Sequence, residues 1–266
     1  MHFLDIVRLS FCTITSYKLR SALTSLGLIV GIAAVIILTS LGRGLHTFVI
    51  AEFTQFGTKI IGVHPGKKNT FGISGASMNT VRPLSLADAA ALTKLAGVVA
   101  VVPVVQGNAR VETDNKQRRS NVIGVSDTVP QVWKIRTVLG RFLPSGEDTN
   151  PRAFAVLGDK LATELFGQTS PLGKRVRIGA DRYRVLGVME KKGQMLGFDM
   201  DDTVYIPAGK ALEMFDRESL MEINLLYGNN VTVASVQKNI KQLLIARHGG
   251  EDFTIVTQNQ ILESMD

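Results

Sequence analysis

The segment 23-LTSLGLIVGIAAVIILTSLG-42 decides the architecture of this 266-residue chain. Residues 21–42, between Arg20 and Arg43, carry no charged side chain. At a rise of ~1.5 Å per residue, a helix of this length matches a bilayer hydrocarbon core of ~30 Å. A cleaved secretory signal has a shorter apolar stretch, of ~7–15 residues, behind a brief basic head. The segment therefore predicts an uncleaved transmembrane helix.

Basic residues on the two flanks of the span indicate its orientation. Arg8, Lys18 and Arg20 precede the span, whereas Arg43 and Lys59 follow it. Because cytoplasmic flanks are enriched in Lys and Arg, this narrow excess favours a cytoplasmic N-terminus. The residues after about position 43 would then be extracytoplasmic.

Small residues recur on one face of the predicted span. Thr24, Gly27, Gly31 and Ala34 follow one another at spacings of three, four and three. Such a face lets two helix backbones approach closely inside lipid, so it predicts packing against another membrane helix. The alternative is that glycine is simply common in membrane helices.

The residues before the span show an amphipathic pattern. Phe3, Val7 and Phe11 share one helical face, and Arg8 lies beside them. The pattern predicts a helix within residues 1–20 on the cytoplasmic membrane surface. An extension of the spanning helix is the alternative.

Charge and cysteine usage exclude some classes of protein. The chain has 30 Lys and Arg against 23 Asp and Glu, and a single cysteine, Cys12. No disulfide can therefore stabilise the residues after the span. The densest basic run, KQRRS at 116–120, has no interleaved aromatic residues, so we interpret it as a solvated loop and expect no nucleic-acid binding.

The first of two strand–helix–strand units is predicted within residues 58–110. A short strand ends at Pro65, and Ser85 with Asp88 forms a capping box that starts a helix. The apolar run VVAVVPVV follows as a buried strand, in which Pro103 indicates a bulge or a sheet edge.

The second such unit is predicted within residues 222–257. Its helix has an apolar face that begins at Val233 and ends at Arg247, His248 and two glycines, which is typical of a helix C-terminus. Thr257 is followed three residues later by a glutamine in a further capping box, so a new helix is expected over residues 258–266. Because that helix would be cut short, we expect the natural chain to continue.

Residues 111–221, between the two units, consist mostly of short Val- and Ile-rich runs and predict an inserted β-rich subdomain. We expect a hairpin turn at Gly179–Asp181 and a short helix from Asp159 to Phe166. The predicted fold class is α+β. A transmembrane helix with a stalk (21–57) precedes a split βαβ/βαβ subdomain that carries the insertion.

The sequence lacks the motifs of several kinds of chemical site. GVHPGKK lacks the spacing of a Walker A loop, since Gly62 and Gly66 bracket three residues instead of four. The histidines at positions 2, 46, 64 and 248 are scattered, so no metal site is expected. Asp201 and Asp202 are interpreted as exposed turn residues and not as an acid/base pair. We predict no catalytic, metal-binding or nucleotide-binding residue and no cofactor.

Taken together, several stretches resemble the MacB/FtsX-type permeases of ABC transporters. They are SYKLRSALTSLGLIVGIAAVIILTSLGRG around the span, LSLADAAALTKLAGVVAVVP in the first unit, and GRFLPSGED, AVLGDKLATELFGQTSPLGKRVRIGADRYRVLGVME and KKGQMLGFDMDDTVYIP in the insertion. The resemblance implies that 58–110 and 222–257 form a membrane-proximal porter-like subdomain and that 111–221 form a smaller sabre-like one. The later spans of the family are absent from these residues.

The resemblance also implies a function and partners. The chain would be a membrane subunit of the bacterial inner membrane that transmits the motion of a separate P-loop ATPase to its extracytoplasmic domain, for export or extraction of a substrate. It implies a dimer of permeases and, in some members, a periplasmic adaptor. The alternatives are a single-span receptor or adaptor with an outer binding domain and a secreted enzyme. A secreted enzyme would need both a cleavable signal and a catalytic motif, and the sequence shows neither.

Overall fold

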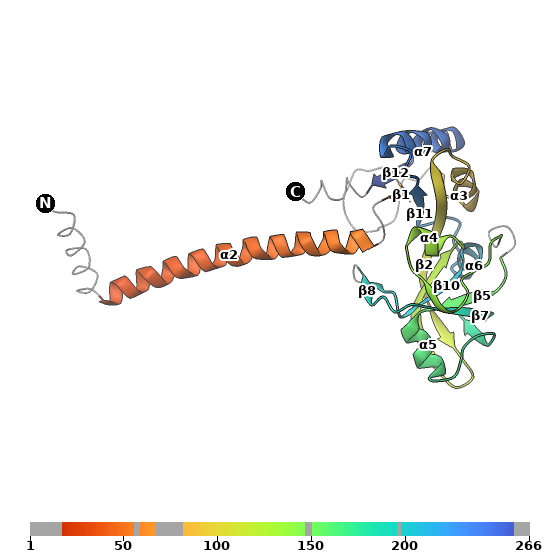
Figure 1. Cartoon of the computed structure of the whole chain (residues 1–266), viewed down its shortest axis with the longest axis horizontal. Coiled ribbons are helices and arrows are strands. Elements are labelled where there is room, and N and C mark those ends of the chain that lie inside the picture. The colour runs from red at the N-terminus through yellow and green to blue at the C-terminus, as the bar shows by residue number, and fades with distance from the viewer. Residues whose placement is uncertain (1–17, 56–58, 67–81, 147–150, 196–197, 258–266) are drawn as a thin grey trace. The chain divides into compact units, whose positions relative to one another are not determined.

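The computed structural model describes residues 18–55, 59–66, 82–146, 151–195 and 198–257. The chain divides into two compact units, residues 1–51 and residues 52–266. The first contains most of helix α2 (Lys18–Gln55), and the second contains every strand described (Figure 1).

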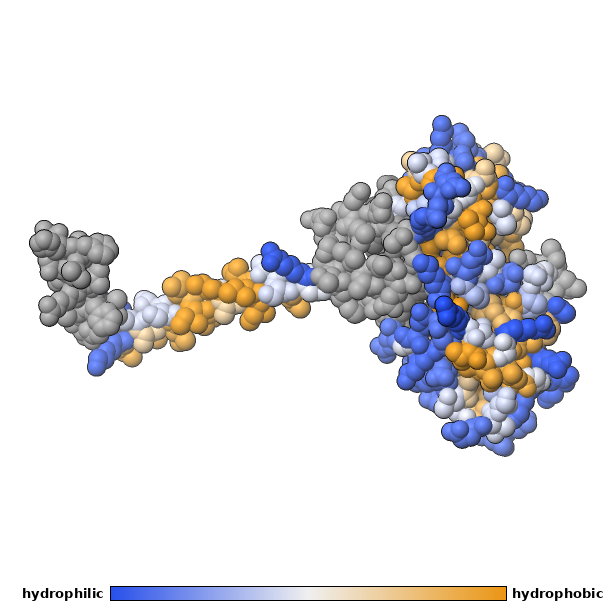
Figure 2. Space-filling model, in the orientation of Figure 1, coloured by the Kyte–Doolittle hydropathy of each residue, from blue (hydrophilic) through white to orange (hydrophobic). Residues whose placement is uncertain are grey.

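Helix α2 runs without a break through the predicted span. It is 38 residues long, and its part Lys18–Gly44 contains an 18-residue window with a mean hydropathy of 2.4. The apolar side chains of this part are exposed, as the 66% exposure of Ile37 illustrates. Figure 2 shows them as a band along the helix with polar residues at either end. The prediction of a helix long and apolar enough to cross a membrane is confirmed, and the predicted stalk is helical to Gln55.

The second unit contains the two predicted strand–helix–strand units, which interleave into one four-stranded sheet. The elements are β1 (Ile60–Pro65), α3 (Leu86–Leu92), β2 (Val98–Glu112), β11 (Glu222–Tyr227), α7 (Val233–His248) and β12 (Phe253–Thr257). The strand order is β12-β1-β11-β2, and all neighbours are antiparallel. Therefore β1 and β2 run parallel with β11 between them, and β11 and β12 run parallel with β1 between them. This is a split βαβ arrangement.

Local signals set the ends of the two helices on this sheet. Ser85 accepts a hydrogen bond from the backbone of Asp88, and the Asp88 carboxylate accepts one from the backbone of Ser85, so the predicted capping box is confirmed. Helix α3 ends at Leu92. Helix α7 ends at His248, where Gly249 takes the left-handed conformation at φ 82°.

The inserted region is mostly β, as predicted. Its strands are β3 (Gln117–Val125), β4 (Thr137–Gly140), β5 (Phe154–Leu157), β6 (Arg175–Ile178), β7 (Asp181–Met189), β8 (Gln194–Met195), β9 (Phe198–Asp199) and β10 (Thr203–Pro207). Its helices are α4 (Val129–Val132), α5 (Asp159–Phe166) and α6 (Ala208–Met214). The predicted helix α5 and the β6–β7 hairpin turn are confirmed. Strand β4 and helices α4 and α6 had no distinct signal in the sequence.

Strand pairing closes the inserted region on itself. Strand β2 pairs with β3, and the path continues through β10, β5 and β7 to β6. Strand β6 then pairs back onto the end of β2, where Val111 lies opposite Ile178. The six strands thus form a closed circuit, which leaves no free edge among them. Tyr183, Val176 and Val122 are among the side chains buried in the larger core cluster.

Strand β2 belongs to both sheets. Its residues 98–104 pair with β11, and its residues 105–112 pair with β3. Pro103 lies in the first part, which among the described strands pairs on one side only, so the predicted edge position is confirmed. The predicted subdomain boundary between residues 110 and 111 falls inside this strand, and the subdomain division stays a prediction.

One expectation about this region was wrong. Residues 117–120 of the basic run KQRRS belong to strand β3 and not to a loop. The turn of the β2–β3 hairpin precedes them, where the backbone of Thr113 bonds to Lys116. Pairing with β2 extends the strand into polar residues because the ladder uses backbone groups only. The expected helices within 1–20 and 258–266 lie outside the described residues, apart from the start of α2.

Candidate functional site: a membrane helix and two polar clusters

The predicted packing face lies on the exposed surface of α2. Thr24, Gly27, Gly31 and Ala34 are all exposed, and apart from the backbone of α2 itself nothing described lies within 4 Å of a side-chain carbon built on either glycine. The Thr24 hydroxyl donates to the Arg20 carbonyl at 2.9 Å, so the helix itself satisfies it. The face is open for a partner helix, and its role stays a prediction. The other predicted contact residues, Phe3, Val7, Arg8 and Phe11, lie outside the described residues.

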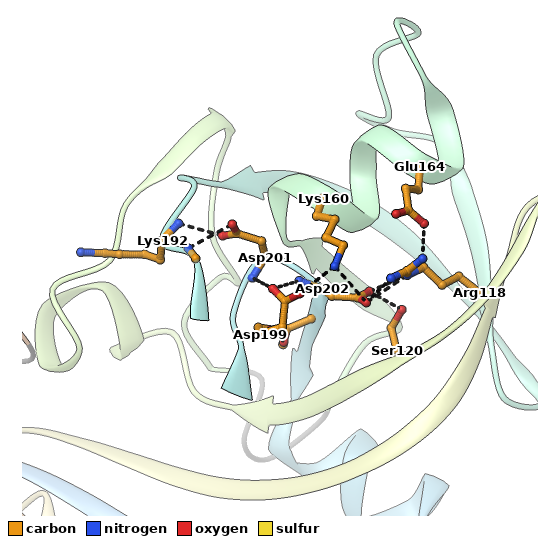
Figure 3. Close-up of polar contacts among 10 residues, drawn as sticks. Arg118, Ser120, Lys160, Glu164, Lys192, Asp199, Asp201 and Asp202 are labelled. Atoms are coloured by element: carbon orange, nitrogen blue, oxygen red, sulfur yellow. Dashed lines mark hydrogen bonds and ion pairs between the residues drawn. The ribbon is translucent and has the colours of Figure 1, made fainter. Parts of the chain in front are cut away.

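A polar cluster joins four elements of the inserted region around the start of β10 (Figure 3). Arg118 on β3 donates from Nε to both oxygens of Asp202, at 2.9 and 3.0 Å, and from Nη2 at 2.5 Å. The same guanidinium forms an ion pair with Glu164 of α5. Ser120 adds a hydroxyl bond to Asp202 at 2.9 Å. The fork geometry is the strong, oriented form of the Arg–carboxylate contact.

The remaining carboxylates of this loop are also satisfied. Lys160 of α5 donates to Asp199 at 2.8 Å, and the other oxygen of Asp199 accepts the backbone N–H groups of residues 201 and 202. Asp201 accepts the backbone N–H groups of Lys192 and Gly193, at 2.7 and 3.0 Å. Asp199 therefore joins α5 to the turn before β10, and Asp201 joins the same turn to residues 192 and 193.

The hydrogen bonds of this cluster keep the carboxylates of Asp202 and Asp199 ionised. Burial opposes ionisation of Asp202, but hydrogen bonds from Arg118 and Ser120 lower its pKa below the usual value. The hydrogen bond from Lys160 likewise lowers the pKa of Asp199. A general acid needs a pKa raised toward neutrality, so these groups are poorly suited to proton transfer. The cluster is a structural clamp.

This clamp corrects part of the sequence interpretation. Residues 200–202 do form a turn, as expected, but Asp201 is only 5% exposed and is not an open turn residue. The partners of Asp202 lie on strand β3 and helix α5, which are distant in sequence. The two-residue alternation of β3, which puts position 118 on the same face as buried Ser120 and Val122, is the signal that could have indicated the inward direction of Arg118.

A second polar cluster fixes the two helices of the split βαβ sheet. Arg247 Nε lies 2.6 Å from Asp88 Oδ1, and the His248 ring places Nε2 3.3 Å from Asp88 Oδ2 and Nδ1 2.8 Å from Asp252 Oδ1. The Asp88, His248 and Asp252 side chains are buried. Burial by itself raises the pKa of Asp88, but hydrogen bonds from Ser85 and Arg247 outweigh it and lower the pKa to about 2. Sequence reasoning identified the cap but missed this second role.

With this geometry established, comparison with known proteins identifies the family. The model of the MacB-like periplasmic core domain matches residues 21–243. The chain belongs to the MacB-like periplasmic core domain family. Its relatives include the macrolide export ATP-binding/permease protein MacB of Azoarcus sp., 32% identical over 257 residues, which cover 92% of this chain and 37% of that protein.

Other MacB-like relatives agree. The MacB of Marinobacter nauticus is 30% identical over 248 residues, with 92% of this chain and 38% of that protein covered. The pyoverdine export ATP-binding/permease protein PvdT of Pseudomonas syringae pv. syringae is 28% identical, with 96% and 38% covered. This MacB-like chain thus spans about two fifths of the length of the curated relatives it matches.

Solved structures support the MacB-like fold. The periplasmic region of MacB from Actinobacillus actinomycetemcomitans superposes with a TM-score of 0.67 at 23% identity, over 79% of this chain and 94% of that one. The extracellular domain of the noncanonic ABC-type transporter YknZ from Gram-positive bacteria gives 0.60 at 20% identity, over 74% and 100%. The α+β fold class and the family resemblance predicted from sequence are confirmed.

Proposed function

We propose that this chain provides the first span and the extracytoplasmic domain of the permease part of a MacB-type export transporter in the bacterial inner membrane. The observation that supports this most is the single helix α2. Its apolar part, Lys18–Gly44, is long enough to cross a bilayer, and the same helix continues to Gln55, shortly before β1 of the MacB-like domain begins.

The proposed role of α2 is mechanical. An unbroken α-helix keeps all its backbone hydrogen bonds, so a displacement at one end is carried to the other. Motion driven by ATP would enter at the N-terminal segment and leave through the extracytoplasmic domain. The clamp at Asp202 and the cluster at Asp88 support this role because their ion pairs and hydrogen bonds hold the elements of the extracytoplasmic domain together. The domain would then move as a rigid body.

Catalysis of ATP hydrolysis is assigned to a P-loop ATPase outside these residues. The sequence predicts a separate subunit, whereas the names of the relatives place ATP binding and permease in one protein. We further propose a dimer that packs through the Gly27 and Gly31 face, and a periplasmic adaptor as a partner. Purification of the native complex, with peptide mapping of its ATP-binding component, tests the first assignment.

The topology can be tested with the native thiol. Cys12 is the only cysteine, and the proposal places it in the cytoplasm. In intact spheroplasts a membrane-impermeant maleimide should leave Cys12 unlabelled until lysis. In a Cys12→Ser background, Lys94→Cys, at an exposed position after the span, should label at once. Labelling of Cys12 in intact cells would contradict the orientation.

The mechanical role can be tested by breaking the helix. Ile36→Pro removes a backbone hydrogen bond and kinks α2 within the span. In a strain that lacks the native gene, we expect this variant to reach the membrane and bind its partners but to fail to restore export of macrolides or siderophores. Ile36→Leu is the matched control. Full export by the proline variant would argue against transmission through α2.

A further inference from the structure

Six exposed arginines occupy the outward face of four neighbouring strands. The strands β3, β2, β6 and β7 follow one another through paired ladders. The arginines stand in three directly opposed pairs, which we name the arginine array. The pairs are Arg119 with Arg110, Arg177 with Arg182, and Arg175 with Arg184.

The alternation of the strands places the array on one side. On β6, exposed Arg175 and Arg177 alternate with buried Val176 and Ile178. On β7, the arginines flank buried Tyr183 in the same way. Because successive side chains of a strand point to opposite faces, the buried residues face the core and the arginines face solvent.

Folding alone does not account for this arrangement. Like charges directly opposite each other destabilise a sheet. Glu112 is the acid that reaches the array, at 3.6 Å from Arg110 and 4.0 Å from Arg177. Across the described part of the chain, no ion pair or hydrogen bond engages the side chains of the other four arginines, at positions 119, 175, 182 and 184.

A hollow adjoins the array and enlarges the cationic surface. It has a volume of roughly 650 Å³ and lies between the β2–β3 turn, the end of α5 and the β6–β7 hairpin. Its charged lining is mostly cationic: Arg175, Arg177, Arg182, Lys116 and Lys174 outnumber the two acids, Glu112 and Asp114. Phe166 also lines the hollow, and the Lys174 ammonium lies over its ring, 5.4 Å from the centroid.

We propose that the arginine array is a docking surface for an acidic segment of a partner protein. Guanidinium forks match carboxylates in a bidentate manner. Arginines two positions apart on one strand are ~6.7 Å apart, which equals the spacing of alternate side chains in an extended peptide. The array spans four strands, more than one small anion covers. The proposal rests on surface charge and is independent of the transport function.

Binding to a defined acidic peptide tests the proposal. The probe is a labelled synthetic peptide of alternating Glu and Ser, and the control probe replaces Glu by Gln. Fluorescence anisotropy with the full chain in detergent should show binding of the Glu peptide, weakened by salt, and no binding of the Gln peptide. Equal binding of the two peptides, or no binding of the Glu peptide, would overturn the proposal.

Matched variants locate the binding site. Arg182→Gln with Arg184→Gln should weaken binding of the Glu peptide by about tenfold or more. Lys94→Gln with Lys238→Gln removes the same charge from exposed positions elsewhere and should change binding less than about twofold. Equal weakening by the two double variants would overturn the assignment, because it would indicate a net-charge effect.

Two further readouts separate docking from other roles. Since the double arginine variant relieves repulsion, its melting temperature should stay the same or rise, whereas a structural role predicts a fall.

Phosphatidylglycerol vesicles and duplex DNA are competing probes. If either binds through Arg182 and Arg184 while the Glu peptide does not, the partner is a membrane or a nucleic acid and the proposal is wrong.

Discussion

The Nε atom of Arg247, in the last turn of α7, lies 2.6 Å from Oδ1 of Asp88, in the first turn of α3. The same carboxylate accepts the backbone N–H of Ser85, at 2.9 Å, and caps α3. Asp88 is fully buried, while the Arg247 side chain is 31% exposed. One carboxylate therefore holds the end of one helix against the beginning of the other.

Asp88→Asn should lower the free energy of unfolding of the extracytoplasmic domain by about 2–4 kcal/mol. The amide leaves Arg247 without its buried counter-charge and weakens the cap of α3. Urea unfolding followed by circular dichroism measures the change. Glu218→Gln, at an exposed position, is the control and should stay within about 0.5 kcal/mol. A loss below about 1 kcal/mol for Asp88→Asn would contradict a structural role for the contact.

The stability of the domain should depend on pH through Asp88. Its pKa is lowered from 3.8 to about 2 in the folded protein. The ionised form therefore stabilises the fold above the unfolded pKa near 4, and this contribution is lost as the pH falls toward 2. The loss should amount to about 2 kcal/mol. In the Asp88→Asn variant, the free energy of unfolding should depend less steeply on pH in this window. An unchanged slope would contradict the prediction.

The clamp at Asp202 requires an arginine at position 118. Arg118→Lys keeps the charge but cannot donate the same fork, so it should cost about 1–2 kcal/mol. Arg119→Lys, on the same strand with an exposed side chain, should cost less than about 0.5 kcal/mol. Thermal unfolding of the pair measures the difference. Equal melting temperatures would show that the fork does not stabilise the fold.

Among the residues that the structure describes, the Tyr183 hydroxyl has no hydrogen-bond partner, although the side chain is fully buried. Burial raises the pKa of this phenol well above 10, so it stays neutral. Tyr183→Phe should leave stability unchanged or increase it by up to about 1 kcal/mol, because an unpaired buried hydroxyl costs free energy. Denaturant midpoints provide the measurement. A loss above about 1 kcal/mol would reveal a bonding partner for the hydroxyl.

The small-residue face of α2 predicts an effect of bulk in the membrane. Gly27→Leu with Gly31→Leu should prevent close helix approach and reduce association with partner spans several-fold. Ser25→Leu with Ala33→Leu adds bulk on the opposite face of the same helix. Energy transfer between labelled chains in lipid measures association. If the two double variants associate equally, the face has no packing role.

Several elements could be predicted because their causes are local. The cap Ser85–Asp88 spans one turn, and the β6–β7 hairpin depends on the left-handed conformation of Gly179, at φ 60°. The polar start of β3, at residues 117–120, was not predicted as part of a strand. The polar letters of QRRS suggest a loop, but the ladder with β2 and the inward turn of Arg118 override that preference.

The candidate site residues also differ in whether local sequence or distant residues set their contacts. The packing face of α2 follows from spacing within one helix, and the acids at 201 and 202 were correctly placed in a turn. The partner of Asp202, by contrast, lies 84 positions away on Arg118, and that of Asp88 lies 159 positions away on Arg247. No local pattern encodes such a pairing.

By itself, the sequence determined that this chain has an apolar helix of membrane-spanning length and two strand–helix–strand units, because hydropathy, caps and turns act over a few residues. Tertiary structure alone decided that β6 closes onto β2 and that six arginines face one another in pairs. Those relationships depend on strand register, which is fixed only when distant segments bury their apolar faces together.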